Sequence, residues 1–287
     1  MANADLRPMT IGEVLDRMFR LYKERFWLFA GIMCFPYIVL FVVNTSFGLL
    51  ARNTRALTQA GSVSPDAAIT AGLTILGASL LVLVVTFVVT GVGHAATTFA
   101  VSDLYLDRPV SVRGAFAHLR GHVLQVLGVI FVTGLIIFVG CIFLIVPGII
   151  LACRLGVSVP VAMLEDCWPG RAISRSMELT KGFAMQMFLI FILVFALSFG
   201  VSIALQMPFT ILAATPRPHV LPFGLMILQY AFSFIGQVLV GPIGAIAFCL
   251  MYYNLRVRKE GFDVEHLMAS LDAGPAAGSS SAGPVPA

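Results

Sequence analysis

The chain has 287 residues, of which 59% are hydrophobic and 11% are charged, and its formal net charge at neutral pH is +4. A soluble domain carries about 25% charged residues, so this composition excludes a water-soluble globular protein. Apolar residues in such excess must face lipid. We therefore expect an integral membrane protein, and the small positive charge does not indicate nucleic-acid binding.

An amphipathic helix is predicted ahead of the first apolar segment. Its apolar residues recur at the spacing of one helical face: Ile11, Val14, Leu15, Met18, Phe19 and Tyr22. Thr10 and Glu13 have the spacing of a capping box. Because the segment is basic near its end, at Arg20 and Lys23, we expect this helix to lie in the cytoplasmic membrane interface.

Long segments without charged residues predict six membrane-spanning helices, because a bilayer core takes about 20 helical residues. The predicted spans are roughly 26–50, 72–100, 122–146, 149–166, 184–212 and 223–254. The third and fourth spans share one long apolar region that must turn. Pro147 and Gly148 supply the helix break, since proline ends a helix and glycine allows a reversal.

The fourth predicted span is short, and a re-entrant hairpin is the alternative interpretation of this segment. Six spans with both termini in the cytoplasm leave only Arg52, Arg55 and Arg217 on the outer side. A fourth segment that did not cross would divide the Lys and Arg residues almost evenly between the two sides. The positive-inside rule therefore favours six crossings.

Amphipathic segments similar to the first precede the third and fifth predicted spans. An ungapped alignment places Lys23, Arg120 and Lys181 together, and each segment is followed by a helical hairpin. The predicted fold is all-α, with six transmembrane helices arranged as three repeats of an interfacial amphipathic helix plus a helical hairpin. This single domain covers residues 1–271. Residues 272–287 are almost entirely Ala, Gly, Ser and Pro, which predicts a disordered tail.

Four segments together resemble the bacterial multi-pass membrane-domain family named after glycerophosphoryl diester phosphodiesterases. They are LRPMTIGEVLDR at 6–17, VPGII at 146–150, RAISRS at 171–176 and YYNLRVRKEGFD at 252–263. In some members the membrane domain is joined to a phosphodiesterase barrel. Such a barrel needs about 250 residues, for which this chain has no room. The resemblance thus implies the membrane domain alone, in a bacterial cytoplasmic membrane and without phosphodiesterase activity.

Arg154 is the only Lys or Arg within a predicted span, and an intramembrane arginine is by default a functional hypothesis. Its side chain either extends to the outer surface or binds a lipid phosphate or another anionic ligand. Other basic residues expected at the inner face are candidates for the same lipid or anion binding: Arg20, Lys23, Arg120, Arg171, Arg175 and Lys181.

Uncharged polar residues also occur within the predicted spans. His94 could relay protons or be a satisfied core histidine. Gln125 and Gln237, like three further glutamines, are explained by hydrogen bonds between helices. The five cysteines lie in or beside apolar segments without metal-ligand spacing, so no metal site is predicted.

These features favour a non-enzymatic membrane protein without a cofactor. It would be a scaffold, accessory or regulatory module whose basic inner surface contacts anionic lipid, a partner protein or a second copy of the chain. The alternative is a small-solute or lipid transporter with a polar cavity around Arg154 and His94. An embedded enzyme acting on lipid has the least support, because no catalytic motif is present. A continuous polar cavity would favour the transporter, and a closed core would favour the scaffold.

Overall fold

The computed structural model describes residues 9–59, 64–105, 108–213 and 223–261, and within these segments the chain is helical with no strand. The helices are α1 (Ile11–Glu24), α2 (Phe26–Gln59), α3 (Pro65–Tyr105), α4 (Val112–Leu119), α5 (Val123–Phe143), α6 (Ile145–Leu155), α7 (Ser158–Leu164), α8 (Pro169–Thr180), α9 (Ala184–Ala213) and α10 (Phe223–Glu260). The predicted tail at 272–287 lies outside the described residues.

Six helical segments are long and apolar enough to cross a membrane, which confirms the prediction of an all-α, multi-pass membrane protein. They are Phe26–Thr54, Pro65–Tyr105, Val123–Phe143, Ile145–Leu164, Ala184–Leu212 and Phe223–Glu260. The fourth combines α6 and α7, which are separated by Gly156 and Val157. The threefold repeat stays a prediction.

The turn between α5 and α6 differs from the prediction. The chain reverses at Leu144, which has an extended backbone (φ −162°, ψ 135°), and Pro147 lies inside the first turn of α6. Proline is tolerated there because the N–H groups of a first helical turn have no partner within the helix. Gly148 has a separate role, since its Cα carbon packs directly against Cys141 of α5.

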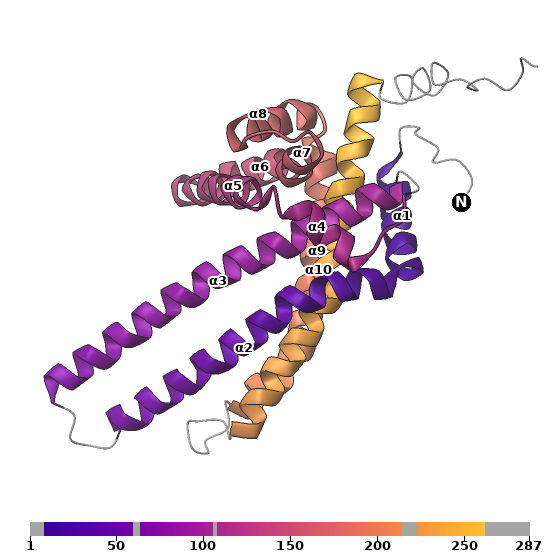
Figure 1. Ribbon diagram of the computed structural model, residues 1–287. Helices are drawn as coiled ribbons and strands as arrows, with labels where there is room; N and C mark the ends of the chain where they lie inside the picture. The colour runs from indigo at the N-terminus through magenta and orange to yellow at the C-terminus, as the bar shows by residue number, and fades with distance from the viewer. Residues whose placement is uncertain (1–8, 60–63, 106–107, 214–222, 262–287) are drawn as a thin grey trace, which may run out of the picture.

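The helix α10 lies at the centre of the bundle and packs against α2, α3, α9 and α1 (Figure 1). Its second half is almost entirely buried, with Ile246, Leu250, Met251 and Tyr252 fully covered. These residues belong to one hydrophobic cluster with Val14 and Met18 of α1, Phe29 of α2 and a series of alanines on α3. The hydrophobic core therefore sits at the end of the bundle near α1.

Both ends of the described chain meet on this side of the bundle. The side-chain oxygen of Asn254 accepts a hydrogen bond from the Met9 backbone N–H at 2.8 Å, and its amide nitrogen donates to the Met9 carbonyl at 3.1 Å. The predicted capping box of Thr10 and Glu13 is present at the start of α1. We call this side proximal, and the opposite side, where α2 ends and α3 begins, distal.

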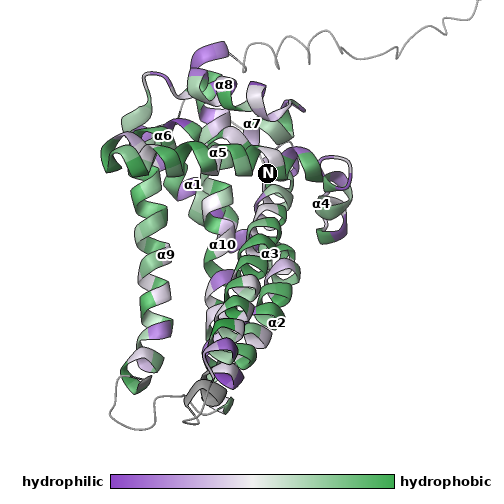
Figure 2. Ribbon diagram, turned by 90° about the vertical axis from the view of Figure 1, so that its left-hand side faces the viewer, coloured by the Kyte–Doolittle hydropathy of each residue, from purple (hydrophilic) through white to green (hydrophobic). Residues whose placement is uncertain are grey.

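The helices α5, α6, α7 and α8 form a layer on the proximal side. Figures 1 and 2 show α5 and α6 running across the bundle, whereas α9 and α10 run along it. We define the hairpin tip as residues 138–150. The tip is exposed except at Gly140 and Gly148.

Candidate functional site

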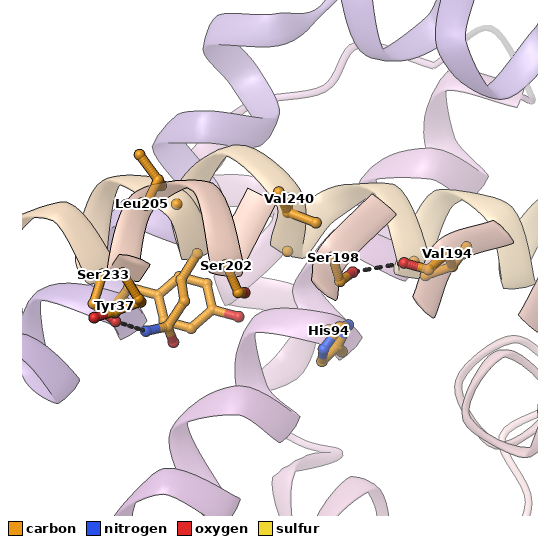
Figure 3. Close-up of a pocket in the computed structure, with 13 residues that line it drawn as sticks. Tyr37, His94, Val194, Ser198, Ser202, Leu205, Ser233 and Val240 are labelled. Carbon is orange, nitrogen blue, oxygen red and sulfur yellow. Dashed lines mark hydrogen bonds between the residues drawn. The ribbon is translucent and has the colours of Figure 1, made fainter. Parts of the chain in front are cut away.

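A cavity of about 330 Å³ lies between α2, α3, α9 and α10 (Figure 3). Its lining comes mostly from α9 and α10, with one residue each from α2 and α3. The lining residues are Tyr37, His94, Val194, Ser198, Ser202, Leu205, Gln206, Ser233, Gly236, Gln237, Val240, Gly241 and Gly244. Because these residues lie within candidate spans, the cavity sits at the level of the membrane.

The lining places hydroxyl, amide and imidazole groups within a largely apolar surface and contains no Asp, Glu, Lys or Arg. The Gln237 amide nitrogen donates to Ser233 Oγ at 3.2 Å, and Ser198 Oγ donates to the Val194 carbonyl at 2.7 Å. The His94 ring and the Ser202 hydroxyl form no hydrogen bond with the described residues. Within the described chain, no side-chain polar atom is both fully buried and without a partner. Both residues line the cavity, where these groups can hydrogen-bond to a ligand.

A second hollow of about 130 Å³ adjoins the first and shares Tyr37, Gln206, Ser233 and Gln237 with it. It adds Asn44 of α2 together with Gln229 and Tyr230 of α10. The Gln229 amide nitrogen donates to Gln206 Oε1 at 3.3 Å, which links α10 to α9. The two hollows form a polar path that leads from His94 toward the distal side.

Glycines on α10 bring the neighbouring helices close to the cavity. A Cβ atom added to Gly241 would lie 3.0 Å from the Tyr37 hydroxyl, and one added to Gly236 would lie 2.7 Å from Leu205 Cδ1. Small residues at such positions allow membrane helices to approach closely. The glycines therefore place the Tyr37 ring of α2 and the polar face of α9 around one space.

The cavity is closed on the proximal side and flanked by separate helices elsewhere. On the proximal side, the fully buried side chains of Ile246, Leu250 and Met251 fill the space around α10. The helix α9 packs against α10 and α6 but makes no extensive contact with α2 or α3. Figure 2 shows α9 on one side of α10 and α2 and α3 on the other. The polar lining can thus be reached between α9 and α2.

Two of the predicted intramembrane polar residues, His94 and Gln237, line the cavity. Gln125 does not, because its amide nitrogen donates to the Ala162 carbonyl at 3.2 Å and to the Cys167 carbonyl, beside the end of α7. Arg154 is not among the lining residues either. It is exposed in the last turn of α6, where its carbonyl accepts hydrogen bonds from Ser176 and Thr180 of α8.

The serines that line the cavity were not predicted from the sequence, although a signal for them exists. Ser198, Ser202 and Gln206 follow one another at intervals of four on α9, and Ser233 and Gln237 have the same spacing on α10. Residues four apart share one face of a helix. A polar stripe within an otherwise apolar span therefore marks the face that turns away from lipid.

The basic residues proposed for the inner face divide into paired and unpaired groups. Arg175 bonds Glu165 at 3.3 Å and Glu178 at 3.4 Å, and it also contacts Glu260. Glu260 in turn pairs with Arg256 at 3.1 Å. This network joins α8 to the end of α10 and compensates the charge of Arg175.

Among the remaining predicted cations, Arg20 pairs with Asp16 at 3.7 Å. The other side chains are exposed and form no hydrogen bond or ion pair with the described residues: Lys23, Arg120, Arg154, Arg171 and Lys181. Burial, followed by the Glu165 carboxylate, raises the pKa of the Cys167 thiol. The described chain contains no cluster of three His, Cys, Asp or Glu residues that could hold a metal ion.

Comparison with known proteins adds no relative: no family model matches the chain, and no curated protein or solved structure is significantly similar to it. The resemblance to the glycerophosphoryl diester phosphodiesterase membrane-domain family therefore stays a prediction. The chain is a multi-pass, all-α membrane protein by its own structure.

Proposed function

We propose that the protein is a lipid or small-solute transporter that binds an amphiphile with an uncharged polar head in the cavity between α2, α3, α9 and α10. The observation that supports this is a cavity at membrane level lined by hydroxyl, amide and imidazole groups without a formal charge. Its location would be a bacterial cytoplasmic membrane, with the proximal side in the cytoplasm. No chemical step is proposed.

The lining chemistry selects the charge of the ligand. A hydrogen-bonding group left unsatisfied out of water costs about 1–3 kcal/mol, so a polar molecule that engages Ser202, His94 and Gln237 is favoured there. A charged head would lose its hydration without meeting an opposite charge, which costs several kcal/mol. A neutral head that carries hydroxyl groups is the ligand that fits.

The shape of the site selects an amphiphile over a free solute. Its volume of about 330 Å³ is at the lower end for small-molecule sites and suits a head group rather than a whole lipid. The separation of α9 from α2 gives apolar chains a route into the bilayer. The exposed apolar residues Phe199 and Ile203 directly follow the cavity-lining Ser198 and Ser202 on α9.

Lipid binding in nanodiscs tests the proposal. Native mass spectrometry would compare dioleoylglycerol, which is uncharged, with dioleoylphosphatidylglycerol, which has the same acyl chains and an anionic head. We expect the uncharged lipid to bind and Gln237→Leu to weaken it roughly tenfold, since one or two hydrogen bonds of about 1 kcal/mol are lost. Gln186→Leu is the matched control, because Gln186 lies in α9 but does not line the cavity. Equal binding by both variants would reject the site.

A scaffold that contacts anionic lipid through its proximal surface is the second candidate function. It is supported by the exposed and unpaired side chains of Arg120, Arg171 and Lys181. The same titration separates the two functions. If the scaffold function is correct, Arg171→Gln with Lys181→Gln lowers binding of dioleoylphosphatidylglycerol and leaves dioleoylglycerol unchanged. Gln237→Leu would then have no effect on either lipid.

A further inference from the structure

We propose that the α5–α6 hairpin does not cross the membrane but lies within one leaflet, parallel to the proximal membrane surface, with the lipids of that leaflet as its partner. Four helices, α2, α3, α9 and α10, would then span the bilayer. The inference is independent of the cavity and its ligand. It concerns the two candidate spans Val123–Phe143 and Ile145–Leu164.

The first observation is the way in which α5 meets the bundle. It meets α3 where the rings of Phe87 and Phe131 lie 6.1 Å apart and Ile130 packs against Gly91. The hairpin tip beyond this region has no buried residue except Gly148. Both ribbon views show α5 and α6 crossing the direction of α9 and α10 (Figures 1 and 2). The hairpin tip therefore extends away from the bundle, whereas the rest of the hairpin packs against α3 and α9.

The second observation is that the charged helix α8 runs alongside this hairpin. The start of α8 touches α5, where Pro169 packs against Gly128. The end of α8 touches α6, where Ser176 and Thr180 donate hydrogen bonds of 2.8 and 3.1 Å to the Arg154 carbonyl. The 12 residues of α8 form a helix about 18 Å long. Any tilt of the hairpin into the membrane would thus carry α8 with it.

Arg154 lies well along the hairpin from its base. The Gly140 position of α5 packs against Gly148 and Leu151 of α6, and Thr133 Oγ1 lies 3.2 Å from Ser158 Oγ. Arg154 is therefore opposite the middle of α5. If α5 crossed the bilayer, Arg154 and the adjoining end of α8 would lie near the bilayer centre.

Electrostatics decides between the two orientations. The exposed charged residues of this region include Arg171 and Glu178 of α8, Lys181 directly after α8, and Arg154. A charged residue at the centre of a membrane helix is strongly disfavoured. An in-plane hairpin instead places all four at the head groups and leaves the apolar residues of the tip, such as Phe138, Phe143 and Ile145, among acyl chains. This arrangement is typical of interfacial helices.

The in-plane hairpin also agrees with the distribution of basic residues. A hairpin that crosses twice and one that never crosses both return the chain to the same side. The residues that follow, including Arg171 and Lys181, stay on the proximal side in either case. The positive-inside rule therefore does not separate four crossings from six, and a direct measurement of depth is needed.

Site-directed spin labelling measures that depth in the full-length protein reconstituted in liposomes. Single nitroxides are placed at four exposed positions along the hairpin: Leu124, Phe131, Phe138 and Leu144. Matched labels follow α9, which spans the membrane in both arrangements: Met185, Ile192, Phe199 and Met207. Accessibility to oxygen and to a water-soluble nickel complex gives the depth of each label.

We expect the four hairpin labels to report one shallow depth, whereas the α9 labels pass through a maximum near Ile192 and Phe199. A hairpin profile that passes through the bilayer centre, as on α9, would overturn the proposal. So would a depth that increases steadily to the centre at Leu144, which indicates a re-entrant loop. Each position is labelled separately, so exposed neighbours such as Leu135 and Val139 replace any variant that does not fold.

Discussion

Gly148→Ala tests the close packing that holds α5 against α6. A Cβ atom at position 148 would lie 2.8 Å from the Cys141 backbone nitrogen, 2.9 Å from its Cα carbon, and in contact with its Sγ. Ordinary contacts of a Cβ atom are about 3.4–4 Å, so the helices must separate by roughly 0.6–1 Å. Overpacking of this kind costs about 1–3 kcal/mol. The midpoint of thermal unfolding should fall by roughly 2–10 °C.

The measurement is thermal unfolding of the purified protein in detergent, with Gly134→Ala as the matched control. Gly134 lies in the same hairpin, and nothing would meet an added Cβ atom there within 4 Å. Because alanine favours a helix over glycine by about 0.5–1 kcal/mol, the control should keep or raise its midpoint. Adding Cys141→Ala should recover only part of the loss, since the backbone contacts remain. Equal midpoints for both glycine variants would refute the packing argument.

Two further predictions concern the proximal layer. Arg175→Met should destabilise the protein by about 2 kcal/mol, because it leaves Glu165, which is about a quarter exposed, without a cation and leaves Glu260 with Arg256 alone. A denaturant or thermal series would show this, and Arg171→Met, at an unpaired position, should have little effect. Cys167 should react slowly with iodoacetamide at pH 8, because burial raises the pKa of its thiol and only the thiolate reacts. Mass spectrometry of the native and unfolded protein checks this, and equal rates would contradict it.

Helix locations were predictable from the sequence because they depend on local composition. Each candidate span contains a long, strongly apolar segment with few charged residues, and the Thr10–Glu13 capping box is a short-range pattern. The turn at Leu144 was misplaced because proline in a first helical turn and proline after a last turn look alike in a sequence. Only the backbone conformation separates the two.

The candidate site was half predictable for a similar reason. His94 and Gln237 stand out as polar residues in apolar spans. They line one cavity because α3 and α10 pack together. Contacts between segments so far apart along the chain produce no recognisable pattern in a single sequence. Arg154 was assigned to a span because its neighbours are apolar. Its contact with α8, through Ser176 and Thr180, lies more than 20 residues away.

The central position of α10 has a consequence for biosynthesis. It is the last of the described helices to be made, yet α1, α2, α3 and α9 all pack on it. At about 5–20 residues per second, roughly 10–30 s separate the completion of α3 from that of α10. During this interval the faces of α2 and α3 that carry Tyr37 and the buried alanines have no helix to cover them. The earlier helices must therefore wait beside the translocation machinery or in lipid, and the bundle closes in a single late step when α10 enters.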